Sequence, residues 1–354
     1  MSVTKVLLAE PRGFCAGVEK AIKALAWMVR VFEPPIYCYH EIVHNQLVVE
    51  RFRKLGVVFV DTVDQVPPGA PVMLSAHGTA PAVVTSSQEA GRISINAVCP
   101  LVTKVHHEVK VRSQRGYEII YIGHRGHDEA VGTVAVAPES VHLIEDEHDL
   151  RELDRIDGPV ALVAQTTLSM DEWAEVRQEV EREYPEIWMP TKSDLCFATT
   201  NRQGALKEIA QRADAVVVLG SSNSSNTVAL EKVARSRGVT QVFRVNSASE
   251  LPRDLAGVVG VTAGASAPDE LVDEVIASLN PTHGVEIVHY TAEEEYFPPP
   301  PELRDFLRSL SALLKVALAS PLPYGTALED DASVSASRTL MELNRDLSES
   351  KTPR

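Results

Sequence analysis

Apolar stretches that end in polar residues alternate with helix-like stretches along most of the chain. Three segments open in the same way, with a cysteine at a turn and then a helix-like stretch: RGFCAGVEKAIKAL, NAVCPLVTKVHHEV and SDLCFATTNRQGALKEIA. Two strand-like stretches follow in each segment, and each leads into another helix. Such alternation is typical of α/β units, so we expect three of them, each with a mainly parallel sheet.

Polar side chains stand where the strand-like stretches end. The first position, 28 or 29 residues beyond each cysteine, holds His44 with Asn45, His127 with Glu129, and Ser224 to Asn226. The second, 62 to 70 residues beyond, holds His77, Thr166 with Thr167, and Ser266. Ligands bind at the carboxyl ends of the strands in α/β sheets. All three units are therefore expected to contribute side chains to ligand binding.

The repeat also sets the expected domain boundaries. We place the three α/β units at residues 1–97, 98–194 and 195–285. Three similar units can meet around a pseudo-threefold axis, and such a trefoil would bring the three cysteines of the repeat to one centre. The sequence leaves open whether the assembly is a monomer or a homodimer.

Beyond residue 290 the character of the chain changes. A run of four prolines precedes a stretch in which Leu303, Phe306, Leu307 and Leu310 have helical spacing. We expect residues 286–318 to be a Pro-rich connector and a docked helix. The content of Ser, Asp, Glu and Lys rises further on, so residues 319–354 are expected to form a mobile tail.

Composition narrows the possible functions. The formal net charge of −15 and the lack of a Lys/Arg run argue against binding to nucleic acid or anionic lipid. The first apolar run is too short for a signal peptide, and no stretch approaches a membrane span. Four dispersed cysteines form no disulfide framework, so we expect a cytoplasmic protein with free thiols.

Cys15, Cys99 and Cys196 are the candidate metal ligands because they occupy the same position of the repeat. Their spacings of 84 and 97 residues fit only a site assembled in three dimensions, although three buried structural cysteines remain an alternative. If they held a 4Fe-4S cluster, one iron would lack a protein ligand and could act on substrate oxygen while the cluster supplied electrons. Cys38 lies outside the repeat and is expected to be structural.

The polar residues at the strand ends form a second constellation. Helix-start N–H groups with hydroxyl, amide and imidazole donors suit an anion such as a diphosphate. Taken singly, each Ser, Thr or Asn is better explained as an ordinary helix N-cap, and it is the convergence of several from three units that favours an anion site. The candidate substrate-binding residues are His44, His77, His127, Thr166, Thr167, Ser224, Ser225, Asn226 and Ser266. The sequence contains neither a P-loop nor a G-x-G-x-x-G motif, so it gives no sign of a bound ATP or nicotinamide.

Glu129 is the acid within one of these junctions, in GHRGHDEAVGT, beside His127. In an apolar pocket its pKa would be tuned by burial, and it would serve as a general acid near a bound hydroxyl. The alternative is that Glu129 stabilises the first turn of a helix.

Nine motifs resemble those of the 4-hydroxy-3-methylbut-2-enyl diphosphate reductase family, in the same order over about residues 5–305. They are PRGFCAGV, EIVHNQLVVE, SAHGTAP, NAVCP, GHRGHDE, QTTLS, CFATTNRQ, SSNSSN and AGASAPD. The resemblance implies an α/β trefoil around a central 4Fe-4S cluster on the three cysteines of the repeat. It also implies that Glu129, with His127 and Thr166, handles the proton and the carbinol oxygen. The residues that it implies for the diphosphate are His44, His77, Ser224, Asn226 and Ser266.

The implied reaction is a reductive dehydroxylation that yields isopentenyl and dimethylallyl diphosphates, with a ferredoxin or flavodoxin as electron donor. We expect the donor to dock near Arg12, Lys20 and Lys23. The chain departs from the family at Asp128, where the family usually has Pro; this carboxylate is expected to raise the pKa of Glu129 or to alter the turn. The rival interpretations are a zinc-dependent hydrolase and a non-catalytic, cluster-containing sensor of diphosphates.

Overall fold

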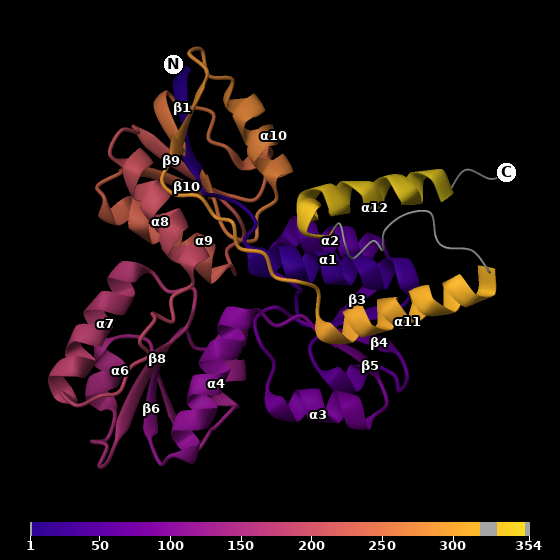
Figure 1. Cartoon of the computed structure of the whole chain (residues 1–354). Helices are drawn as coiled ribbons and strands as arrows, with labels where there is room; N and C mark the ends of the chain where they lie inside the picture. The colour runs from indigo at the N-terminus through magenta and orange to yellow at the C-terminus, as the bar shows by residue number, and fades with distance from the viewer. Residues whose placement is uncertain (1, 319–330, 351–354) are drawn as a thin grey trace.

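The computed structural model describes residues 2–318 and 331–350 of the chain (Figure 1). Three sheets form three lobes around a common centre, and each sheet is covered by helices. In every lobe the first strand of the repeat lies between the second and the third, in the orders β3-β2-β4, β7-β6-β8 and β10-β9-β11. All neighbouring strands within the three sheets pair in parallel. The predicted trefoil of α/β units is thus confirmed.

The first lobe contains a four-stranded sheet in the order β3-β2-β4-β5. Its elements are α1 (Ala16–Val31), β2 (Ile36–Tyr39), α2 (Gln46–Lys54), β3 (Val57–Val60), η1 (Val63–Gln65), β4 (Pro71–Leu74), α3 (Pro81–Glu89) and β5 (Ile93–Asn96). Ile22, Leu25 and Met28 of α1 are fully buried in the core of this lobe. Asn45 caps α2 by accepting the N–H of Val48 at 3.2 Å, which fixes the chain just after His44.

The second lobe has a three-stranded sheet in the order β7-β6-β8. Its elements are α4 (Pro100–Gln114), β6 (Glu118–Ile122), α5 (Asp128–Val134), β7 (Val141–Ile144), α6 (Glu147–Glu152), β8 (Val160–Ala164) and α7 (Met170–Glu183). Along β6, Ile119 and Tyr121 join the core on one face while Ile120 and Ile122 join the core on the other. A parallel sheet that is covered on both faces needs such a continuous apolar run.

The third lobe has a five-stranded sheet in the order β10-β9-β11-β1-β12. Its elements are β1 (Val3–Glu10), α8 (Phe197–Ala210), β9 (Ala215–Leu219), α9 (Ser225–Ser236), β10 (Gln241–Val245), η2 (Ala248–Glu250), β11 (Gly257–Ala263), α10 (Asp269–Leu279) and β12 (Val285–His289).

Strand β1 corrects the predicted boundary of the first unit, because it belongs to the third sheet between β11 and β12. Val6 and Leu8 are buried in the core on one face of that sheet, and Leu7 and Ala9 in the core on the other. Such a doubly buried run needs an interior position, which the third sheet provides. Strand β12 likewise occupies the start of the segment that we expected to be a connector.

Two C-terminal helices complete the first lobe: α11 (Pro301–Leu318), and α12 (Ala336–Ser350) after the short η3 (Asp331–Ser333). Leu303 and Leu307 of α11 are buried in the core that α1 also lines. Figure 1 shows α12, in yellow, lying along α1.

The prediction that residues 319–354 form a mobile tail is wrong for the start of α12. Ala336, Leu340 and Leu343 lie at helical spacing and are buried in the core of the first lobe, with exposed fractions of 0, 1 and 3%. The same expectation for residues 319–330 and 351–354 lies outside the described residues. None of the helices within the described ranges has the length and apolarity needed to cross a bilayer.

Candidate active site

The three cysteines of the repeat occupy equivalent places, each as the N-cap residue of a helix. Cys15 precedes α1, Cys99 precedes α4 and Cys196 precedes α8. The three residues come from different lobes and line one cavity at the centre of the trefoil. The starts of three helices therefore surround the cavity, and their partial positive charge favours anionic sulfur.

Burial raises the pKa of the Cys99 thiol to about 12, although the backbone N–H groups of Leu101 and Val102 act in the opposite direction. The pKa of Cys196 is also raised, mainly by burial and further by Cys15 and Cys99. A metal deprotonates a coordinating thiol outright. Binding of a metal group at this site would therefore release protons.

Gly17 shows how closely the sulfur atoms meet. A Cβ atom at this position would lie 2.8 Å from Sγ of Cys99 and 3.9 Å from Sγ of Cys15. Any other residue at position 17 would have to displace the Cys99 sulfur, while it would only reach ordinary contact with the Cys15 sulfur, so this glycine keeps the first turn of α1 open to the cavity.

The sulfur atoms are nevertheless spaced too widely for one ion. Among the described residues, Cys15, Cys99 and Cys196 do not form a group with all three sulfur atoms within 4.8 Å of one another. Sulfurs on one tetrahedral zinc ion, at about 2.3 Å each, would be about 3.8 Å apart. The donor set therefore fits a larger group better, and three thiolates can hold a 4Fe-4S cluster by three of its irons.

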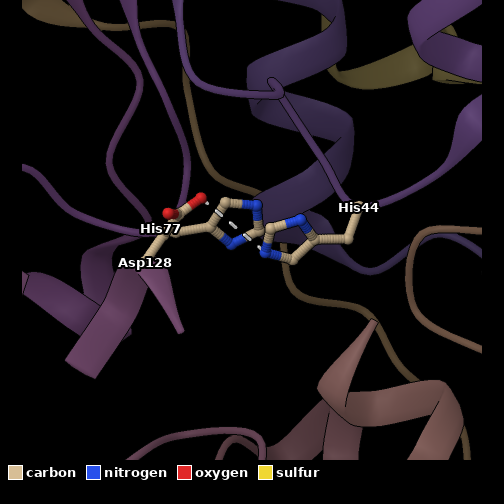
Figure 2. A group of neighbouring side chains, drawn as sticks. All are labelled: His44, His77 and Asp128. Atoms are coloured by element: carbon tan, nitrogen blue, oxygen red, sulfur yellow. Dashed lines mark ion pairs between the residues drawn. The ribbon is translucent and has the colours of Figure 1, made fainter. Parts of the chain in front are cut away.

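Three histidines from two lobes form the next part of the cavity wall. The rings of His44 and His77 stack with their centroids 3.9 Å apart and an angle of 8° between their planes (Figure 2). His127, the N-cap residue of α5, meets them edge-on at 5.2 and 6.0 Å. Burial, together with the charge of His44, lowers the pKa of His77, and it lowers that of His127 to about 4.

Glu129 is buried in the first turn of α5 and faces the loop that follows β8. Its Oε1 accepts the N–H of Thr166 at 2.7 Å, and its Oε2 accepts the Thr166 hydroxyl at 2.9 Å. Burial raises the pKa of Glu129 to about 7, and the charge of Asp194 adds to this effect. Asp128, for which we expected either a raised pKa of Glu129 or an altered turn, pairs with His40 at 2.7 Å and is not among the groups that shift this pKa. Its effect on the turn stays a prediction.

The third lobe contributes hydroxyl and amide groups. Ser224 caps α9 by accepting the N–H of Thr227 at 3.4 Å. Asn226 accepts the N–H of Ala265 at 2.9 Å and donates to the Thr199 hydroxyl at 3.3 Å. Ser266 donates to the backbone oxygen of His44 at 2.9 Å, which ties the third lobe to the first.

The structure brings every candidate side chain from the sequence to the same cavity. Its lining includes Cys15, His44, His77, Cys99, His127, Glu129, Thr166, Thr167, Cys196, Ser224, Ser225, Asn226 and Ser266. Cys38 instead lies fully buried in β2 and in the core of the first lobe.

Two of the expected docking residues are not on the surface. Lys20 is 9% exposed and donates to the backbone oxygen of Val98 at 2.8 Å. Lys23 is 4% exposed and donates to the backbone oxygen of Asp331 at 2.9 Å. Both ammonium groups are held by internal carbonyls, so the expected docking patch is wrong.

Two residues that hold the site in place, Gln165 and Arg202, were not predicted from the sequence. Gln165 donates to the hydroxyls of Thr167 at 2.7 Å and Ser225 at 3.2 Å, and so links two lobes. Arg202 is 1% exposed and donates to the backbone oxygens of Gly13 at 2.8 Å and Phe14 at 3.2 Å, which holds the chain just before Cys15. The sequence held one weak signal for each residue. Gln165 stands next to the polar residues Thr166 and Thr167 at a strand end, and Arg202 lies in the helix that follows Cys196.

Comparisons with known proteins agree with this geometry. The sequence profile of the family described as LytB protein matches residues 6–280. A protein of Rhodopirellula baltica named 4-hydroxy-3-methylbut-2-enyl diphosphate reductase is 44% identical, over 88% of this chain and 99% of its own length. A protein of Bifidobacterium longum with the same name is 45% identical, over 84% and 92%.

Solved structures lead to the same family. The structure of the E-1-hydroxy-2-methyl-but-2-enyl-4-diphosphate reductase from Plasmodium falciparum superimposes with a TM-score of 0.84 and 31% identity, over 88% of this chain and 99% of that one. A second structure, titled as the terminal enzyme of the non-mevalonate pathway, has a TM-score of 0.58 and 28% identity. By sequence and by fold, the chain belongs to the LytB protein family.

Proposed function

We propose that the chain catalyses the reductive dehydroxylation of 4-hydroxy-3-methylbut-2-enyl diphosphate, the activity named in its relatives. The reaction takes up two electrons and two protons, breaks the allylic C–O bond, and releases water and isopentenyl or dimethylallyl diphosphate. The observation that carries this proposal is the cavity itself, where three cysteines from three lobes face a buried carboxyl group and a cluster of histidines.

Cys15, Cys99 and Cys196 are the proposed ligands of a 4Fe-4S cluster. When bound, the cluster supplies the electrons and a Lewis-acidic iron that has no protein ligand. The protein's own contribution is to hold three thiolates at three helix starts and to keep bulky side chains away at Gly17.

Glu129 is the proposed general acid. With a pKa of about 7 it keeps a proton over much of the neutral range, and it can deliver that proton to a hydroxyl group that leaves as water. Thr166 fixes both carboxyl oxygens, and its hydroxyl oxygen can still accept a hydrogen bond from the substrate. Thr167 lines the cavity beside it.

The diphosphate is proposed to bind between the lobes. His44, His77 and His127 approach it from one side, and Ser224, Ser225, Asn226 and Ser266 approach it from the other. His77 and His127 have lowered pKa values, but a phosphate anion beside an imidazole favours the protonated, donating form. Fixing the diphosphate orients the hydroxyl group, and the diphosphate oxygens can deliver the second proton.

A ferredoxin or flavodoxin is the proposed electron donor. The described residues form only the three lobes and two C-terminal helices, and none of these is a reductase domain, so the electrons are proposed to come from a separate protein. The sensor alternative finds no support in the relatives, whose names describe a reductase. The proposed setting is a reducing cytoplasm, consistent with four free cysteines.

The test is a substrate-reduction assay on protein purified without oxygen, with dithionite or reduced ferredoxin supplied. We expect isopentenyl and dimethylallyl diphosphates to form in proportion to the iron and sulfide bound. Protein that contains the cluster and binds the diphosphate but forms neither product would overturn the proposed activity.

A further inference from the structure

His44, His77 and Asp128 form a compact group at the junction of the first and second lobes (Figure 2). One ligand atom from each side chain lies within 4.8 Å of those of the other two. Oδ2 of Asp128 is 3.9 Å from Nε2 of His44. Ligand atoms on one tetrahedral zinc ion would be about 3.4 Å apart, so this pair is already within about 0.5 Å of a binding geometry.

His44 and Asp128 are held from behind by hydrogen-bond partners of the kind that orient metal ligands. Nδ1 of His44 lies 3.4 Å from Oε2 of Glu41, and Asn223 donates to the same carboxylate oxygen at 2.8 Å. His40 holds Oδ1 of Asp128 at 2.7 Å and turns Oδ2 toward His44. A carboxylate behind the far nitrogen of an imidazole, and a hydrogen bond to a ligating carboxylate, are typical outer-shell partners of metal ligands.

The imidazole nitrogens that face the centre of this group lack hydrogen-bond partners among the described residues. Nε2 of His44 and Nε2 of His77 are buried and have no hydrogen-bond partner in the described part of the chain. Buried polar atoms normally have a partner, so both nitrogens call for a ligand. The Asp128 carboxylate beside these nitrogens repels a phosphate group and attracts a cation, so a cation suits all three side chains.

We propose that His44, His77 and Asp128 form a second metal site, distinct from the cysteines, that binds a divalent transition-metal ion of the Zn²⁺ type. Two imidazoles and one carboxylate are a common ligand set for such ions and leave a position open. The ion and a diphosphate both use His44 and His77, so their binding is mutually exclusive at these side chains. Metal binding does not depend on the proposed function, whereas the competition with a diphosphate does.

The experiment is a zinc titration of the anaerobic holoprotein, with free Zn²⁺ held by a metal buffer and the cluster absorbance followed to exclude zinc on the cysteines. Three variants are compared with the wild type. Asp128→Asn removes the anionic ligand but keeps its size, and His77→Gln removes a second ligand independently. Asp149→Asn is the matched control, because His148, Asp149 and Glu152 form a similar group in which the two outer residues are exposed.

We expect one zinc ion per wild-type chain, at least tenfold weaker binding in Asp128→Asn and His77→Gln, and unchanged binding in Asp149→Asn. Inorganic pyrophosphate at constant free Zn²⁺ should lower zinc occupancy of the wild type. Wild-type affinity in both Asp128→Asn and His77→Gln would overturn the metal site. If both variants lose zinc but pyrophosphate fails to compete, the metal site stands and the proposed diphosphate position is wrong.

Discussion

Thr166 holds both oxygens of the Glu129 carboxyl group, through its backbone N–H at 2.7 Å and its hydroxyl at 2.9 Å. The two residues follow consecutive strands of the repeat in the second lobe: Glu129 lies at the start of α5, and Thr166 lies in the loop after β8. This contact fixes a buried acid against the cavity that the cysteines line. It is the structural basis for assigning proton delivery to Glu129.

Glu129→Gln removes the transferable proton but can still contact Thr166, because the amide oxygen can accept the Thr166 N–H and the amide NH2 can donate to the Thr166 hydroxyl oxygen. We expect turnover to fall by about 10²–10⁴-fold, with the iron content and the affinity for pyrophosphate close to wild type. Single-turnover product formation from the reduced protein measures the effect. Turnover within a few-fold of wild type would remove Glu129 from its role.

The pH dependence should follow the same group. Burial raises the pKa of Glu129 from 4.5 to about 7, so the acid form is present below about 7 and is lost as the pH rises through that value. We therefore expect kcat/KM to fall on the alkaline side of about pH 7, because kcat/KM reports the pKa values of the free enzyme. The Thr166 hydroxyl lowers this pKa, so Thr166→Val should move the alkaline limb to higher pH. A kcat/KM profile that is flat from pH 6 to 9 would contradict the assignment.

Asn226→Asp tests the diphosphate position. The aspartate can still accept the N–H of Ala265, as Asn226 does at 2.9 Å, but it adds a negative charge to the cavity. We expect pyrophosphate binding to weaken by at least tenfold, equivalent to about 1.4 kcal/mol. Ser222→Asp adds the same charge at an exposed position of the loop that precedes α9 and should change binding little. Equal effects of both variants would place the diphosphate elsewhere.

The C-terminal helix α12 should contribute to stability. Leu340 is 1% exposed in the core of the first lobe, so Leu340→Ala is expected to cost about 2–5 kcal/mol. Neighbouring Met341 is 44% exposed, and Met341→Ala should change stability by less than about 0.5 kcal/mol. Urea unfolding measures both variants. Matching midpoints would mean that α12 does not support the lobe.

The repeat predicted which side chains meet in one cavity, because each cysteine and each polar residue at a strand end stands at a fixed place in a β-α unit. Parallel α/β sheets carry such positions to one edge, and the trefoil brings the three edges together. That is why His44, Glu129 and Ser266, which are distant in the sequence, line one cavity.

Other features depended on long-range packing that no local pattern shows. Strand β1 has the same apolar character as a strand of the first lobe, and only its partners β11 and β12 assign it to the third. The helical stripe of α12 is short and lies among polar residues, so composition suggested a tail. Lys20 and Lys23 look like surface charges in the sequence, but backbone oxygens of Val98 and Asp331 hold them inside.

We propose that three cysteines from three lobes hold one iron-sulfur cluster, and a Mössbauer and iron-sulfide analysis of anaerobically purified protein tests this most directly. We predict about four iron and four sulfide per chain, with one iron distinguishable from the other three because it lacks a cysteine ligand. Cys99→Ser should lose the cluster, while Cys38→Ala, which alters a buried core residue, should keep it. Zinc in place of iron, or an intact cluster in Cys99→Ser, would contradict the account.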